Sequence, residues 1–151
     1  SSDLGVQPNI EKKKDELSRL EENKQALLDA GTDVQNSEMD ENTKRTVMDL
    51  INAELKANAE KGEEKSQEMN DDLQKLESAK EEVETMKESS AAERQKLEEK
   101  GKLLERMGLG GKIEAAISDM QTHEAELDSL HQEIMKDQEE LNNISQKLSS
   151  L

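Results

Sequence analysis

The chain has 151 residues, of which 30% are hydrophobic, 38% are charged and none is aromatic. Because aromatic side chains normally supply much of the buried area of a globular core, this composition argues against a compact globular domain. The formal net charge of −16 repels phosphate backbones and anionic lipid surfaces, which argues against nucleic-acid binding, membrane-surface binding and direct membrane insertion. The absence of cysteine excludes disulfide and thiolate chemistry.

The first predicted element is a helix over residues 9–30, preceded by a flexible tail over residues 1–8. Pro8 is the only proline, and its missing N–H suits the first turn of a helix. Gly31 follows at the position where a C-cap glycine is expected. The apolar residues of this helix keep a seven-residue spacing: Ile10, Leu17, Leu20 and Leu27.

A longer seven-residue repeat fills the middle of the chain and predicts one helix over residues 40–107, roughly 100 Å long at 1.5 Å per residue. Ser37 and Asp40 resemble a capping arrangement at its start. Gly62 lies in a polar stretch and is the expected weak point. A break there would give the rival fold, a shorter four-helix bundle. The repeat consists of Met48, Leu55, Gly62, Met69, Leu76, Val83, Ser90, Leu97 and Leu104, with Ile51, Ala79, Met86 and Met107 half a heptad later.

Three glycines within residues 108–111 predict a tight turn, because glycine readily adopts positive φ angles at a helix end. The last predicted helix covers residues 112–150. Its heptad positions are mostly apolar, with His123 and Asp137 as polar exceptions: Ile113, Ala116, Met120, Leu127, Leu130, Ile134, Leu141, Ile144, Leu148 and Leu151.

Counting outward from each turn predicts which residues face each other. Met107 should lie opposite Ile113, and Met69 opposite Leu151. The expected fold is therefore all-α: an elongated antiparallel coiled coil of three helices, one long central helix flanked by two shorter ones, in a single domain over residues 9–151. Both chain termini should come close to the middle of the long helix.

The two histidines of the chain are the first candidates for chemistry. His131 follows Asp128 by three residues, which resembles half of a carboxylate-bridged dimetal motif, but such a site needs two Glu-x-x-His pairs and two more carboxylates. We therefore expect His123 to be a polar residue of the helix seam and His131 to lie on the surface. Residues 143–145 match the glycosylation sequon, but they fall on a predicted helix seam, so a chance match is favoured.

Two further motifs have plainer interpretations. Asp29, Asp33 and Asp40 around the first turn loosely resemble a calcium loop, but Val34 stands where an EF-hand requires glycine, which favours a polar loop. Residues 108–112 contain the glycines and lysine of a phosphate-binding loop without its first glycine, its Ser or Thr, or its preceding strand. That segment is expected to be a hairpin turn.

No catalytic, cofactor-binding or metal-binding residue is predicted, and no enzymatic activity is expected. The favoured function is a structural or interaction coiled-coil module, a spacer, scaffold or adaptor acting through its helix faces on unidentified protein partners. Leu50, Leu103 and Met135 lie outside the seams, which leaves edge packing or a homodimer, with a slight preference for the dimer. Two alternatives remain open: the coiled-coil region of a secreted bacterial effector, toxin or secretion-system translocator, and a small-ligand or metal binder built in a bundle core.

The residues say little about location. The N-terminus has no hydrophobic signal core and no apolar run is long enough to span a bilayer. A cytoplasmic location is favoured for this segment, while secretion as part of a larger chain is kept as an alternative.

Overall fold

The computed structural model describes residues 8–151, and this part of the chain forms three α-helices and no strand. The helices are α1 (Ile10–Gln35), α2 (Glu41–Arg106) and α3 (Gly111–Ser149). The predicted all-α fold, with one long helix between two shorter ones, is therefore confirmed. The predicted tail lies outside the described residues except for Pro8, which is buried.

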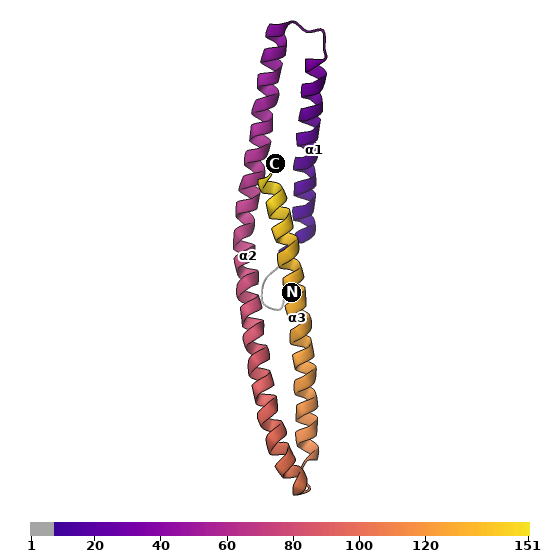
Figure 1. Ribbon diagram of the computed structural model, residues 1–151, viewed down its shortest axis with the longest axis vertical. Helices are drawn as coiled ribbons and strands as arrows, with labels where there is room; N and C mark the ends of the chain where they lie inside the picture. Colours follow the sequence, from indigo (N-terminus) through magenta and orange to yellow (C-terminus); the bar gives the residue numbers. More distant parts are fainter. Residues whose placement is uncertain (1–7) are drawn as a thin grey trace. The chain divides into compact units, whose positions relative to one another are not determined.

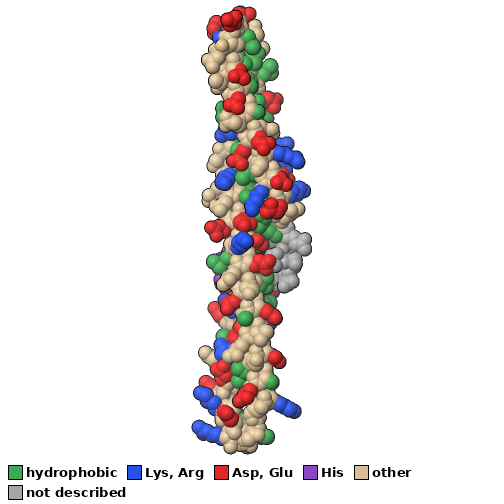
Figure 2. All heavy atoms as spheres, turned by 90° about the vertical axis from the view of Figure 1, so that its right-hand side faces the viewer, with side chains coloured by type: hydrophobic (Ala, Val, Ile, Leu, Met, Phe, Trp, Pro, Cys, Tyr) green, Lys and Arg blue, Asp and Glu red, His purple; other side chains and the backbone are tan. Residues whose placement is uncertain are grey.

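Contacts divide the chain into two compact units. The three-helix unit consists of Pro8–Leu73 and Glu139–Leu151, and the described part of the hairpin unit is Gln74–Gln138. In the three-helix unit, α1 runs antiparallel to the first part of α2, and the end of α3 lies against both (Figure 1). In the hairpin unit, α3 runs antiparallel to the second part of α2 (Figure 1). On the face shown in Figure 2, Asp and Glu side chains are mixed with Lys and Arg except toward the upper end, where acidic side chains predominate.

The first helix is longer than the sequence predicts. α1 continues through Gly31 to Gln35, so the predicted end at residue 30 and the role of Gly31 as a C-cap are wrong. Gly31 is buried, and a Cβ added to it would lie 3.5 Å from Cε of Met48 in α2. The small residue therefore serves packing between the helices, and Val34 adds another buried position beyond it.

Asp40 begins α2 by capping it. Its Oδ1 accepts a hydrogen bond of 2.8 Å from the backbone N–H of Thr43, which is the bond an N-cap side chain makes. Ser37 instead donates from Oγ to the carbonyl of Val34 at 2.6 Å and so belongs to the end of α1. The predicted capping arrangement therefore differs in its roles: Asp40 is itself the N-cap residue of α2, whereas the prediction placed the cap at Ser37 with Asp40 as its partner.

The turn between α2 and α3 matches the prediction. Gly108 has a φ of 76°, the N–H of Leu109 donates to the carbonyl of Leu104 at 2.9 Å, and the N–H of Gly108 donates to that of Glu105 at 3.0 Å. This pair of bonds is the Schellman motif that closes a helix on a left-handed glycine. The turn is therefore tight, and α3 starts at Gly111.

The register of α3 against α2 differs from the predicted one. Ile113 packs on Gly101, where a Cβ would lie 2.8 Å from Cγ2 of Ile113, rather than on Met107. Because Gly101 has no side chain, Ile113 reaches past the last turn of α2, and Met107 is left exposed. Met86, also predicted in the seam, is exposed as well.

The same shift is seen separately in the three-helix unit. Leu151 lies next to Gly62, where a Cβ would be 3.0 Å from its Cδ1, and not opposite Met69, so α3 reaches one heptad further than predicted. The prediction that the C-terminus comes close to the middle of α2 is confirmed. The rival fold is excluded, because α2 is one uninterrupted helix through Gly62.

Replacing Asp40 by Ala should lower the Tm at pH 7, because the N–H of Thr43 loses its acceptor. That hydrogen bond holds the pKa of the Asp40 carboxyl below its ordinary value. A depressed folded-state pKa gives stability that is present above the unfolded-state pKa of about 3.9 and is lost as pH falls through the folded-state value. Thermal melts followed by circular dichroism should therefore show the Ala variant and wild type converging below about pH 4.

Asp40→Asn is the matched control, because Asn caps as well as Asp without titrating. It should keep a Tm near that of wild type at pH 7. An unchanged Tm for Asp40→Ala at pH 7 would contradict the capping role.

Candidate interaction site

The end of α3 completes a core with α1 and α2 in the three-helix unit. The aliphatic residues that meet there are all buried, with at most 6% of their surface exposed. They come from all three helices: Leu17 and Leu20 of α1, Met69 of α2, and Leu141, Ile144 and Leu148 of α3. A third helix therefore closes a seam that two helices alone would leave partly open.

Small residues on α2 make this close packing of the α3 end feasible. A Cβ on Gly62 would lie 2.4 Å from the carbonyl oxygen of Leu148, so the two backbones meet where a side chain is missing. One turn further along α2, Ser66 shares a 2.6 Å hydrogen bond with the hydroxyl of Ser145 and accepts one of 2.8 Å from Ser149. The polar stretch predicted as a weak point is thus a place where the backbone of α3 lies directly against α2.

Asn58 extends this row of small and polar positions toward α1. It is buried, and its Nδ2 donates to the carbonyl of Leu20 at 2.9 Å. Asn58, Gly62 and Ser66 follow one another at four-residue spacing, which places them along one side of α2. A sequence search for aliphatic heptads misses this row, although small residues at four-residue spacing are a known signal of close helix packing.

Beyond the end of α3, the hairpin of α1 and α2 continues without a third helix. We call the residues exposed by this ending the open face: Leu27, Leu28, Met48 and Leu55. Leu27, Met48 and Leu55 are only half-buried although they lie in the seam, and Leu28 is 43% exposed. The open face is therefore an unfinished part of the same aliphatic seam.

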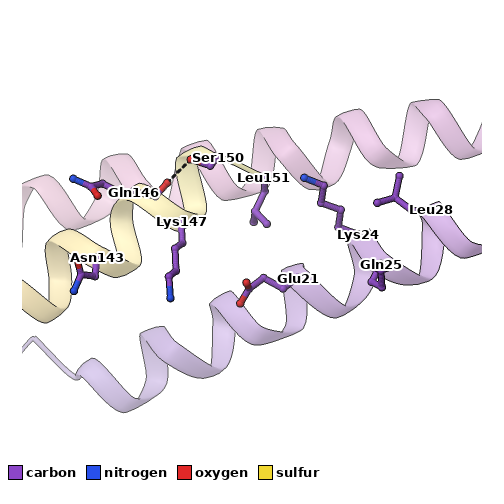
Figure 3. A pocket seen from close by; sticks show the side chains of 9 residues that line it. All are labelled: Glu21, Lys24, Gln25, Leu28, Asn143, Gln146, Lys147, Ser150 and Leu151. Carbon is purple, nitrogen blue, oxygen red and sulfur yellow. Dashed lines mark hydrogen bonds between the residues drawn. The ribbon is translucent and has the colours of Figure 1, made fainter.

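A groove lies between α1 and the end of α3, at the edge of the open face. Leu28 and Leu151 approach it from the two helices, and Figure 3 shows both side chains where α3 stops. Glu21 and Lys24 are on the α1 side, so the groove carries both signs of charge. Its other lining residues are Gln25, Asn143, Gln146, Lys147 and Ser150.

Polar pairs across α2 and α3 hold the hairpin unit together at its flanks. Arg94 bonds Glu98 on its own helix at 2.9 Å and Glu124 on α3 at 2.8 Å. Its pKa is raised by the hydrogen bond to Glu98 first and by that to Glu124 second. Gln138 donates to Glu77 at 2.8 Å. Of these pairs, Arg94–Glu124 and Gln138–Glu77 join α2 to α3.

The two histidines lie apart from each other and differ in exposure. His123 is exposed and Glu124 is the half-buried residue next to it, so the prediction that His123 belongs to the seam is wrong. Nε2 of His131 lies 3.2 Å from Oε1 of Glu84 on α2, and its side chain is 20% exposed. His131 thus bridges the two helices at the edge of the seam rather than standing free on the surface.

The carboxylates weighed as metal ligands have other partners. Asp128 forms an ion pair with Lys87. Asp29 lies within α1 and accepts a 2.9 Å hydrogen bond from Gln25, and Asp40 caps α2. Within residues 8–151 no group of three or more His, Asp and Glu side chains is arranged to hold a metal ion.

None of the helices in the described part of the chain combines the length and hydropathy needed to span a membrane. Comparisons with protein-family models, curated proteins and solved structures gave no match for this chain. The functional argument therefore rests on the surfaces described above.

Gly62→Ala should destabilise the protein, although glycine to alanine inside a helix normally stabilises by about 1 kcal/mol. The added Cβ meets the carbonyl of Leu148, and overpacking of this kind typically costs about 1–3 kcal/mol. Urea denaturation followed by circular dichroism measures the change in the free energy of unfolding.

Gly31→Ala is the matched control, because its Cβ would make an ordinary 3.5 Å contact with Met48. It should be neutral or more stable than wild type by up to about 1 kcal/mol. If both variants gained equal stability, the close approach at Gly62 would be refuted.

Proposed function

We propose that this chain is a non-enzymatic interaction module that binds helices through the open face of α1 and α2, and that the helices it binds are those of a second copy. The observation that carries the proposal is a contrast within one unit. Where α3 covers the hairpin, Leu17, Leu20 and Met69 are buried. Where α3 has ended, Val34 and Ile51 are still buried, but Leu27, Met48 and Leu55 are only half-buried and Leu28 is exposed.

The energy available for binding follows from that contrast. Fully burying one Leu or Met side chain is worth about 1.5–3 kcal/mol relative to leaving it exposed. On the neighbouring stretch of the same seam, burial of Leu141, Ile144 and Leu148 of α3 already provides this stabilisation. A helix with aliphatic residues at heptad positions would gain it on the open face, which continues the seam past Leu151.

A second copy fits this requirement because the open face is complementary to itself. Two α1–α2 hairpins facing each other across a two-fold axis form a four-helix bundle, and such an axis brings the same patch of both copies together. Glu21 and Lys24 lie on the same side of α1 and both line the groove. A two-fold arrangement lets each of these charges meet the opposite charge of the other copy.

Association of this kind would suit a scaffold or spacer. The bound copies would be joined through helix faces, and the faces of the hairpin unit would remain available to other proteins. The aliphatic residues of the seam supply the affinity, while the flanking charges select the partner and its orientation.

Leu28→Lys should weaken the dimer by about a hundredfold, because the symmetric interface loses one leucine from each copy at about 1.4 kcal/mol or more each. The residue is exposed in the single chain, so the fold should be unaffected. Sedimentation equilibrium over a wide range of concentrations measures the dissociation constant, and circular dichroism checks the helix content.

Met135→Lys is the matched control, since it changes an equally exposed apolar residue of the hairpin unit to the same charged residue. It should leave the dissociation constant unchanged. A wild-type mass that stays monomeric at every concentration, or equal weakening by both substitutions, would refute the proposal.

A further inference from the structure

The α2–α3 tip, which we define as residues 100–112, exposes large aliphatic side chains. Leu103 is 60% exposed, Met107 65% and Leu109 60%. Leu103 lies in the last turn of α2 and Met107 directly follows the end of that helix, while Leu109 stands in the turn held by the left-handed Gly108. The three side chains therefore project from the last turn of α2 and from the turn that follows it.

The charge of this tip is opposite to that of the whole chain. Residues 100–112 contain four basic residues and one acidic residue, in a chain with a net charge of −16. All five are exposed: Lys100, Lys102, Glu105, Arg106 and Lys112. Lys and Arg side chains project at the end of the molecule that carries this turn, the lower end in Figure 2.

The turn between α1 and α2, residues 36–42, is acidic. Residues 36–42 contain Glu38, Asp40 and Glu41 and no Lys or Arg, and Met39 is their one large apolar side chain. Acidic side chains gather at the end that carries this turn, the upper end in Figure 2. Lys44 and Arg45 follow this segment in α2, so the clearest difference between the two turns is in their apolar side chains: Leu103, Met107 and Leu109 at the α2–α3 tip against Met39 at this turn.

We propose that the α2–α3 tip adsorbs to anionic phospholipid surfaces, with Leu103, Met107 and Leu109 entering the interface and the basic side chains contacting the headgroups. Charge complementarity supports an anionic surface. The convex shape of a helix turn favours a deformable surface such as a bilayer. Apolar side chains on a tip can enter a lipid interface without a preformed pocket. The adsorption is peripheral, and no helix crosses the membrane.

The small area of the tip favours a lipid surface over a protein surface as its binding partner. A stable protein–protein interface takes about 800 Å² from each partner, which three side chains on a turn do not supply. Adsorption to a bilayer has no such threshold, because each buried apolar group and each basic residue near anionic lipid adds to the affinity separately. The few groups present on the tip are therefore sufficient for a lipid surface.

The acidity of the chain as a whole does not prevent this contact. At physiological ionic strength charges further apart than about 8 Å are largely screened from each other. The lipid therefore responds to the charges of the tip, of which Glu105 is the only acidic one within residues 100–112. Glu98, Glu99 and Glu114 stand just outside the tip. Glu98 is one helical turn from Lys102 and so within the screening length. These three carboxylates set a limit on the strength of binding.

Flotation of the full chain with two kinds of vesicle tests the proposal. We expect the chain to float with vesicles of equal parts phosphatidylglycerol and phosphatidylcholine, and to remain unbound with phosphatidylcholine alone. Raising the salt from about 0.1 M to about 0.5 M should release it, because the Debye length shortens. Failure to bind the anionic vesicles at low salt would overturn the proposal.

The variant Leu103→Gln, Met107→Gln, Leu109→Gln should bind the anionic vesicles at least about tenfold more weakly, because the apolar anchors are removed. The variant Lys102→Glu, Lys112→Glu should also lose binding, because the tip then carries a net negative charge. Circular dichroism confirms that both variants keep their helix content.

The matched control removes the same number of exposed apolar side chains elsewhere: Met39→Gln, Leu50→Gln and Met135→Gln. It should bind vesicles like wild type. Equal loss in the control and tip variants would overturn the proposal. So would a tip variant that binds vesicles normally and instead changes the mass of the dimer, since the tip would then be a protein contact. This inference does not depend on the dimer proposed above.

Discussion

The close approach of the α2 and α3 backbones at Gly62 is the constraint on which the three-helix unit depends. Because Gly62 has no side chain, the last turn of α3 lies directly against α2, with the carbonyl of Leu148 only 2.4 Å from the position of a Cβ. Leu148 and Ile144 are buried as a result. The hydroxyls of Ser66, Ser145 and Ser149 satisfy one another beside this contact, so the close approach leaves those groups bonded.

The same contact determines where the aliphatic seam is finished and where it is not. α3 stops at the level of Gly62, and the hairpin of α1 and α2 goes on without it. With no aromatic residue in the chain, there is no large side chain to cover the rest of the seam from within. Within residues 8–151 the seam beyond this level is formed by α1 and α2 alone, and Leu27, Met48 and Leu55 are half-buried there.

Heptad spacing was sufficient to predict the number of helices, their order and the α2–α3 turn, because apolar periodicity and glycine turn chemistry are local signals. It was not sufficient for the register. Gly31 was expected to end a helix and Gly62 to be a weak point, yet each lies inside a helix and receives a side chain or a backbone from its neighbour, as Gly101 does. Whether a glycine ends a helix or allows a second helix to pack closely against it depends on the partner helix. The sequence around the glycine carries no information about that partner.

The errors at Met86, Met107 and His123 are changes in the spacing of the buried stripe. Lys87 and Glu124 are half-buried where Met86 and His123 were expected to be, and Gly101 and Leu104 are the half-buried positions near the end of α2, so residues assigned to the seam turn outward. A shift of this kind converts residues expected to bury surface into residues that expose it. At the α2–α3 tip it leaves Met107 exposed together with Leu103 and the basic side chains, and the proposed adsorption to lipid rests on this exposed combination more than on the average charge of the chain.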